Sequence, residues 1–312
     1  MEFYLTLRLL AKVCIDIFVI LSGYGYSESI KNKPIGLLTF YKKRLVTIYS
    51  NYWFIAIIFV PIGILFMGRP LSEAFASHFY MNFALQMIGL YGEHGYNGTW
   101  WYISLIIPLI ILFPFMFTLT KKYGLIFLSL CLLIFLSAPK LHIPIVQGFL
   151  MSFALGIYLS QSNGIVLLSN LINRYKWWRY LILIMLILLV VVVRSYIPVL
   201  YGRTSIDWLF GGLIIFFMYE ISEISKRVCR WLAFCGEHLF NIFLFHSFIC
   251  YYYWADFIYL FHFPLLIFVV LLFVCLAVSI LIEIIKKLLF FYKIVESIKN
   301  VKVPPKIDRI FQ

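Results

Sequence analysis

The sequence predicts an all-α integral membrane protein, a polytopic bundle of about nine transmembrane helices. Of the 312 residues, 64% are hydrophobic and only 12% are charged, and the mean hydropathy is +0.99. A soluble domain carries about 25% charged residues. The apolar residues also gather into long runs with few charges, which is what a bilayer requires of a crossing helix. Membrane lipid is therefore an expected partner, and a large soluble core is excluded.

Each expected crossing helix is a run of about 20 mostly apolar residues. The stretch 75–91 is shorter and contains His78, Asn82 and Gln86, so we expect an interfacial or re-entrant helix there. The expected crossing helices cover residues 9–26, 48–67, 100–118, 123–137, 143–160, 178–196, 206–221, 231–252 and 264–285. Together they form one transmembrane domain, residues 1–290, followed by a basic tail, residues 291–312.

The positive charge indicates the topology. The net charge is +13, and most of the 26 Lys and Arg residues lie in alternate connections between the expected helices or in the C-terminal tail. Because cytoplasmic loops are enriched in Lys and Arg, this side, with the C-terminus, is expected in the cytoplasm of a plasma membrane protein. The charge therefore needs no nucleic acid as partner. The Lys- and Arg-rich connections are 28–47, 119–122, 161–179, 222–230 and the tail from 286.

No cofactor-binding or metal-binding motif is visible. The six cysteines show no CxxC spacing and lie mostly in apolar runs, which favours core packing over disulfides or a metal site. HExxH, a glycine-rich nucleotide loop and GxSxG are all missing from the sequence. We expect no metal and no bound cofactor.

Ionisable residues inside an expected span are candidates for function, because burying them in a bilayer is costly. Asp16 is either a catalytic partner or the structural partner of Lys12 one turn earlier. Ser22 and Gly23 close the same span and either serve the site or allow close helix packing. His246 lies deep in the span 231–252, where it is either a general base or a packing residue.

Two further segments have both a structural and a functional interpretation. Residues 40–45 (FYKKRL) are a basic cluster at the start of a span. Such a cluster anchors the topology, or it binds the phosphates of an anionic donor such as coenzyme A. Residues 99–104 (TWWYIS) at the outer end of another span form an aromatic belt or part of a site.

Taken together, these segments resemble the membrane-bound acyltransferase 3 family, whose members acylate, often O-acetylate, cell-surface polysaccharides. The similarity covers nearly the whole chain, and its elements occur in the family's order. They are residues 15–24 (IDIFVILSGY), 40–45 (FYKKRL), 99–104 (TWWYIS) with Phe113-Pro114, 236–246 (GEHLFNIFLFH), and Pro264 with 279–287 (SILIEIIKK).

The resemblance implies transfer of an acyl group, most often acetyl from acetyl-CoA, to a hydroxyl of a surface polysaccharide or its precursor. Acetyl-CoA is then a co-substrate and a surface glycan the acceptor. His246 and Asp16 would be catalytic, and Lys43 and Arg44 would bind the donor. The implied cavity lining is Ser22, Gly23, Tyr24, Trp100, Trp101, Tyr102 and Asn241.

The sequence also departs from the family's pattern. Family members open with a helix that bears an arginine and, about ten residues later, a histidine that acts as base; the resemblance implies that this helix is missing here. Thr47 replaces a second arginine, and Leu239 a common serine. Two alternatives therefore stay open, a transporter or flippase for polysaccharide precursors and an inactive remnant of a truncated gene.

Overall fold

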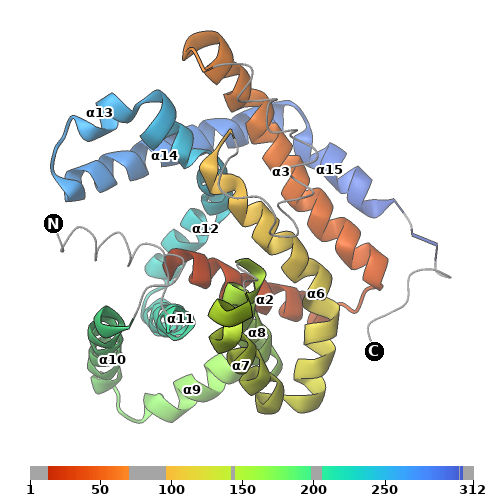
Figure 1. The fold of residues 1–312 in the computed structure, drawn as a ribbon, viewed down its shortest axis with the longest axis vertical. Helices are drawn as coiled ribbons and strands as arrows, with labels where there is room; N and C mark the ends of the chain where they lie inside the picture. The colour runs from red at the N-terminus through yellow and green to blue at the C-terminus, as the bar shows by residue number, and fades with distance from the viewer. Residues whose placement is uncertain (1–12, 70–95, 142–144, 198–205, 302, 305–312) are drawn as a thin grey trace. The chain divides into compact units, whose positions relative to one another are not determined.

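The structure is a computed structural model that describes residues 13–69, 96–141, 145–197, 206–301 and 303–304 (Figure 1). Within these ranges the chain is helical, with no strand, as the composition predicts. The expected interfacial helix at 75–91 lies outside the described residues. The main helices are α2 (Val13–Asn32), α3 (Leu37–Phe66), α6 (Trp101–Tyr123), α7 (Leu125–Leu141), α8 (Ile145–Gln161), α9 (Gly164–Asn173), α10 (Trp178–Tyr196), α11 (Asp207–Ile224), α12 (Lys226–Ser247), α14 (Pro264–Leu288) and α15 (Phe291–Asn300).

Three short elements complete the described chain. A 3₁₀ turn, η1 (Gly98–Trp100), precedes α6. A π-helical turn, η2 (Phe248–Tyr253), extends α12, and the short α13 (Ala255–Tyr259) follows it.

Fewer of the described helices meet the length and hydropathy of a span than the nine expected. Among the described residues, six helical stretches are long and apolar enough to cross a membrane, or seven if the bent pair α8 and α9 is one span. Each of the nine expected segments contains a helix, but three differ from a simple span. The apolar part of α7 is short, and α8 meets α9 at a bend of 72°. Asn163, in the left-handed region with φ 51°, and Gly164 lie at this bend.

Helix α11 is the third segment that differs from a simple span, because two of its carboxylates are buried inside the protein. Asp207 pairs with Arg194 of α10, with Nε 2.7 Å from Oδ1, and both side chains are buried. Glu220 pairs with Arg179 of the same neighbouring helix at 3.3 Å. A carboxylate in a bilayer needs such a partner. The expected span 206–221 is therefore a helix held by ion pairs to α10 rather than an uncharged lipid-facing one.

The chain divides into two compact units, within α6 at Pro108 and within α12 at Arg230. Unit 1 comprises Met1–Leu37, Pro108–Cys229 and Ile310–Gln312, and unit 2 comprises Leu38–Ile107 and Arg230–Arg309. In unit 1, α2 packs against α8 and α11, and α10 packs against α11 (Figure 1).

Unit 2 is built around aromatic contacts between α3 and the carboxyl end of α12. The Phe59 ring of α3 stacks on Phe245 and Phe248, with centroids 5.4 and 5.2 Å apart. Trp100 meets Tyr52 and Phe248 edge to face. Helices α3 and α15 also lie side by side in this unit, where Phe54 meets Phe291 (Figure 1).

Candidate active site

His246 lies near the carboxyl end of α12, one residue before the helix gives way to the π-helical turn η2. Its Nδ1 is 3.1 Å from the carbonyl oxygens of both Ile242 and Phe243. Carbonyl oxygens only accept hydrogen bonds, so Nδ1 carries the hydrogen, and in the neutral ring Nε2 is the acceptor. The local helix geometry thus sets the tautomer that a general base needs.

The aromatic residues of segment 99–104 hold the helix turn that precedes His246. The indole Nε1 of Trp100 donates to the Leu244 carbonyl oxygen at 2.9 Å. The Tyr102 ring meets the Phe243 ring edge to face, with centroids 5.0 Å apart. The Trp101 ring meets the Tyr102 ring edge to face. The structure therefore brings two of the expected lining residues, Trp100 and Tyr102, to the same turn of α12.

A buried hydrogen-bonded cluster at the start of η1 adds residues that the sequence analysis missed. The Asn97 side-chain oxygen accepts from the Thr99 amide at 3.0 Å and from the Ser247 hydroxyl at 2.6 Å. Its amide donates to the Leu244 carbonyl oxygen at 3.2 Å. Asn97-Gly98-Thr99 before an apolar run is typical of a helix start, where Asn caps free amides. This signal was available in the sequence, but the partner Ser247 was not.

Asn241 belongs to a second buried cluster, five residues before His246 on α12. Lys286 of α14 is 1% exposed, and its Nζ donates to Asn241 Oδ1 at 2.8 Å and to Asn51 Oδ1 of α3 at 2.7 Å. Glu283 lies 3.1 Å from the same Nζ and accepts from the Asn241 amide at 2.6 Å. The buried Lys286 ammonium group thus connects three helices. We call Asn51, Asn241, Glu283 and Lys286 the Lys286 network.

Tyr292 of α15 extends the Lys286 network by donating to Glu283. Burial, and after it the Glu283 carboxylate, raises the pKa of the Tyr292 phenol, so the hydroxyl keeps its proton and remains a donor. An acidic and a basic residue three positions apart in a span are a detectable sequence signal. The sequence analysis used residues 279–287 only for the resemblance and missed this role.

Lys43 and Arg44, the expected donor-binding residues, lie in the first turns of α3. The Arg44 guanidinium lies over the Phe40 ring, 5.6 Å from its centroid. The Lys43 carbonyl oxygen accepts from the Thr47 hydroxyl, so this threonine bonds to its own helix. Two turns further along α3, Asn51 joins the helix to α12 through the Lys286 network.

The remaining expected residues lie on α2, in unit 1. Asp16 is 1% exposed and accepts a hydrogen bond from the Ser152 hydroxyl of α8. Its proposed alternative partner, Lys12, lies outside the described residues. Gly23 packs against α8 so closely that a Cβ there would lie 2.5 Å from the Phe153 carbonyl oxygen. Ser22 and Tyr24 flank it and are partly buried.

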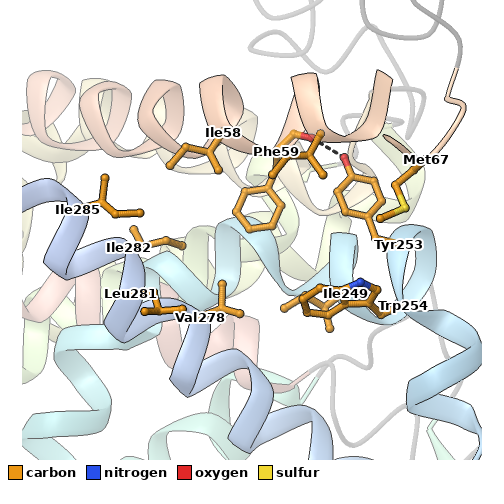
Figure 2. Close-up of a pocket in the computed structure, with 11 residues that line it drawn as sticks. Ile58, Phe59, Met67, Ile249, Tyr253, Trp254, Val278, Leu281, Ile282 and Ile285 are labelled. Atoms are coloured by element: carbon orange, nitrogen blue, oxygen red, sulfur yellow. Dashed lines mark hydrogen bonds between the residues drawn. The ribbon is translucent and has the colours of Figure 1, made fainter. Parts of the chain in front are cut away.

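A cavity of about 220 Å³ lies in unit 2 between α3, η2 and α14 (Figure 2). Its walls are largely aliphatic and aromatic, with Phe59, Ile249 and Ile282 among them, and the Tyr253 hydroxyl donates to the Phe59 carbonyl oxygen at 2.5 Å. None of the expected site residues lines it. A cavity without convergent charged groups does not suit the phosphates of an anionic donor.

Comparison with known proteins identifies the family. Residues 1–284 match the model of the acyltransferase 3 family, which is described as an acyltransferase domain. No curated protein and no solved structure matches the chain. The match covers most of the chain, including every segment of the resemblance up to residue 284. The chain therefore belongs to the acyltransferase 3 family and is a membrane acyltransferase.

Proposed function

We propose that this acyltransferase moves an acetyl group from acetyl-CoA to a hydroxyl group of a cell-surface polysaccharide or its precursor. The family supplies the acyl transfer. The observation that carries the proposal is the hydrogen bonding of His246, whose Nδ1 hydrogen is held by backbone carbonyl oxygens. The ring can therefore accept a proton at Nε2, which is the requirement for activating a hydroxyl.

In the proposed reaction, Nε2 of His246 takes the proton of the acceptor hydroxyl as its oxygen attacks the thioester carbonyl carbon. The carbon–sulfur bond then breaks, and the proton passes to the departing CoA thiolate. The products are the acetyl ester of the glycan and free CoA. Asp16 is the second proposed catalytic residue, and Asn241, Trp100 and Tyr102 are proposed to line the site of acyl transfer.

The proposed donor site is the amino end of α3. Arg44 and Lys43 would bind the phosphates of acetyl-CoA, because a guanidinium binds phosphate through two parallel hydrogen bonds. The distribution of Lys and Arg supports a cytoplasmic location for this end. The plasma membrane is the proposed location of the protein, since its proposed acceptor lies at the cell surface. His246 lies near the carboxyl end of α12, which is the end proposed to face outward. An acceptor at the outer face could therefore approach the histidine.

The test of the base is H246Q, measured as glycan-dependent release of free CoA thiol from acetyl-CoA in proteoliposomes. Glutamine keeps a donor for the backbone carbonyls but is not a base at neutral pH, so we expect a loss of about 10²–10⁴ in rate. H262N is the matched control, because His262 is exposed, lies between α13 and α14 and has a φ of 55°, which asparagine tolerates. Unchanged activity in H246Q would exclude His246 as the base, and glycan transport without thioester cleavage would exclude the enzyme.

The donor site has its own measurement. R44Q should raise KM for acetyl-CoA about tenfold or more with a smaller change in kcat, since it removes binding common to ground and transition states. K33Q, an exposed lysine just before α3, is the control. An unchanged KM in R44Q would mean that the basic cluster serves only the topology.

A further inference from the structure

Helix α15 begins directly after the last membrane span. Only Leu289 and Phe290 separate Leu288, the last residue of α14, from Phe291, the first of α15, and Phe290 makes the turn with a φ of 52°. Leu288, Leu289 and Phe290 are 71%, 59% and 61% exposed. Exposed apolar side chains therefore connect the end of α14 to the start of α15.

The side chains of α15 separate into three faces. An α-helix turns about 100° per residue, so Ile294, Ile298 and Val301 fall within about 60° of one another. They are 56%, 46% and 63% exposed. About 100° further round, Val295 is buried against the protein, on the side where Phe291 meets Phe54 of α3.

The third face of α15 is polar. Lys293, Glu296 and Asn300 lie about 200–260° from Ile294, and all are exposed. The Asn300 amide donates to Glu296 at 3.0 Å, so these groups satisfy each other in water. One face of α15 thus contacts protein, one suits water, and the apolar face (Ile294, Ile298 and Val301) lies between them.

We propose that α15 lies in the plane of the membrane and inserts its apolar face into the leaflet at the carboxyl end of α14, with anionic lipid headgroups bound by its lysines. A helix that lies in the membrane surface beside a bundle has three kinds of surroundings: protein on one side, lipid on a second and water on a third. The three faces of α15 match these surroundings. A soluble partner or a second copy would not require the exposed apolar side chains that connect α14 to α15.

Charge decides which lipid is preferred. Helix α15 carries Lys293 and Lys299 on opposite sides of its apolar face, Lys287 lies in the last turn of α14, and Glu296 is the only acidic residue of α15. Anionic headgroups attract basic residues at the membrane surface. Lys42 near the start of α3 donates to the Val301 carbonyl oxygen at 2.7 Å, so the carboxyl end of α15 is also held against α3. The proposal requires no acyl transfer and is independent of the proposed function.

Photo-crosslinking in native membranes tests whether lipid contacts the apolar face of α15. Benzoylphenylalanine is introduced at Ile294, and at Glu296 as the matched control, and both proteins are checked by size-exclusion chromatography before illumination. We expect lipid adducts at position 294 by mass spectrometry and few at 296. A crosslink from 294 to a second copy or another protein, no adduct there, or equal lipid adducts at both positions would overturn the proposal.

A second measurement tests the headgroup with the purified protein carrying benzoylphenylalanine at 294. In vesicles of equimolar phosphatidylcholine and phosphatidylglycerol, we expect the phosphatidylglycerol adduct to dominate. K293Q and K299Q should each lower this preference, by up to about fivefold. Equal adducts of the two lipids, unchanged by either substitution, would overturn the anionic part of the proposal.

Discussion

Asp16 and Ser152 show how a single buried residue combines stability with a proposed chemical role. The Ser152 hydroxyl of α8 donates to the Asp16 carboxylate of α2, and both side chains are buried. A carboxylate at this depth is costly unless it is hydrogen-bonded. The contact therefore stabilises the α2–α8 pair whether or not Asp16 takes part in acyl transfer, and the two roles need separate measurements.

For the structural role we expect S152A to destabilise the protein by about 1.5–3 kcal/mol, the usual value for a hydrogen bond to a charged group. For the chemical role we expect D16N to keep most of the stability, because its amide oxygen still accepts from Ser152, but to lower acyl transfer about 10²-fold or more. Thermal unfolding and CoA release measure the two effects. If D16N retains full activity, Asp16 is structural only.

At the scale of elements, the close approach of α2 and α8 depends on small residues. A Cβ on Gly23 would lie 2.5 Å from the Phe153 carbonyl oxygen of α8, and one on Gly156 of α8 would collide with the Ile20 carbonyl oxygen of α2. Glycine at helix contacts in membranes allows the backbones to approach. This finding supports the packing interpretation of Gly23.

The two glycines of α2 provide a matched pair. We expect G23A to destabilise the protein by about 1–3 kcal/mol, since the backbone of α8 must move. G25A should be neutral or stabilising by up to about 1 kcal/mol, because no atom lies within 4 Å of its added Cβ and alanine favours the helix. The melting temperatures of both variants in detergent test this, and equal shifts would contradict it.

The Lys286 network acts on the same scale, since it joins α3, α12 and α14. K286M leaves Glu283, Asn51 and Asn241 without their shared donor, so we expect a loss of about 1–3 kcal/mol, the usual cost of leaving buried acceptors unpaired. The neighbouring K287M is the control, because Lys287 is exposed and should change stability by less than about 0.5 kcal/mol. The double variant K286M/E283Q should cost less than the sum of its single changes, and an additive result would show that the two side chains act separately.

At the scale of the whole molecule, the arrangement of charge gives the chain its direction in the membrane. The tail and alternate connections carry most of the 26 Lys and Arg residues, whereas residues 253–263 carry none. Each described span is therefore expected to run between a side rich in Lys and Arg and a side with fewer of them.

A reporter fused after Gln312 tests this topology. We expect green fluorescent protein there to fluoresce and alkaline phosphatase there to be inactive, as for a cytoplasmic end. The same reporters inserted next to His262 should give the opposite result. Active alkaline phosphatase at the C-terminus would reverse the proposed orientation and, with it, the side from which the donor approaches.

The sequence alone singled out Trp100, Tyr102 and His246 as candidates, because each stands in a short recognisable segment, and the structure shows that the three lie on neighbouring contacts. The hydrogen-bond partners of buried polar residues could not be predicted from the sequence. Asn97 and Ser247 are 150 positions apart, and Asp16 and Ser152 are 136 apart. Such contacts depend on which helix faces meet, and hydropathy carries no information about that.

The number of spans was only partly predictable for a related reason. Length and hydropathy identified the helices, since a bilayer tests these properties one segment at a time. They did not show that α8 and α9 bend by 72°, or that the carboxylates of α11 pair with Arg194 and Arg179 of α10. A bend depends on backbone conformation at one or two residues, and an ion pair depends on a neighbouring helix.

The amino-acid sequence by itself determined that this protein is a helical membrane protein of the acyltransferase 3 family. Composition, local hydropathy and short segments are enough for that conclusion, because the bilayer acts on each helix separately. Only the tertiary structure decided which buried polar groups pair, how the Lys286 network joins three helices, and that α15 has an exposed apolar face. These features arise where helices distant in the sequence come into contact, and the partner of each group is chosen by packing.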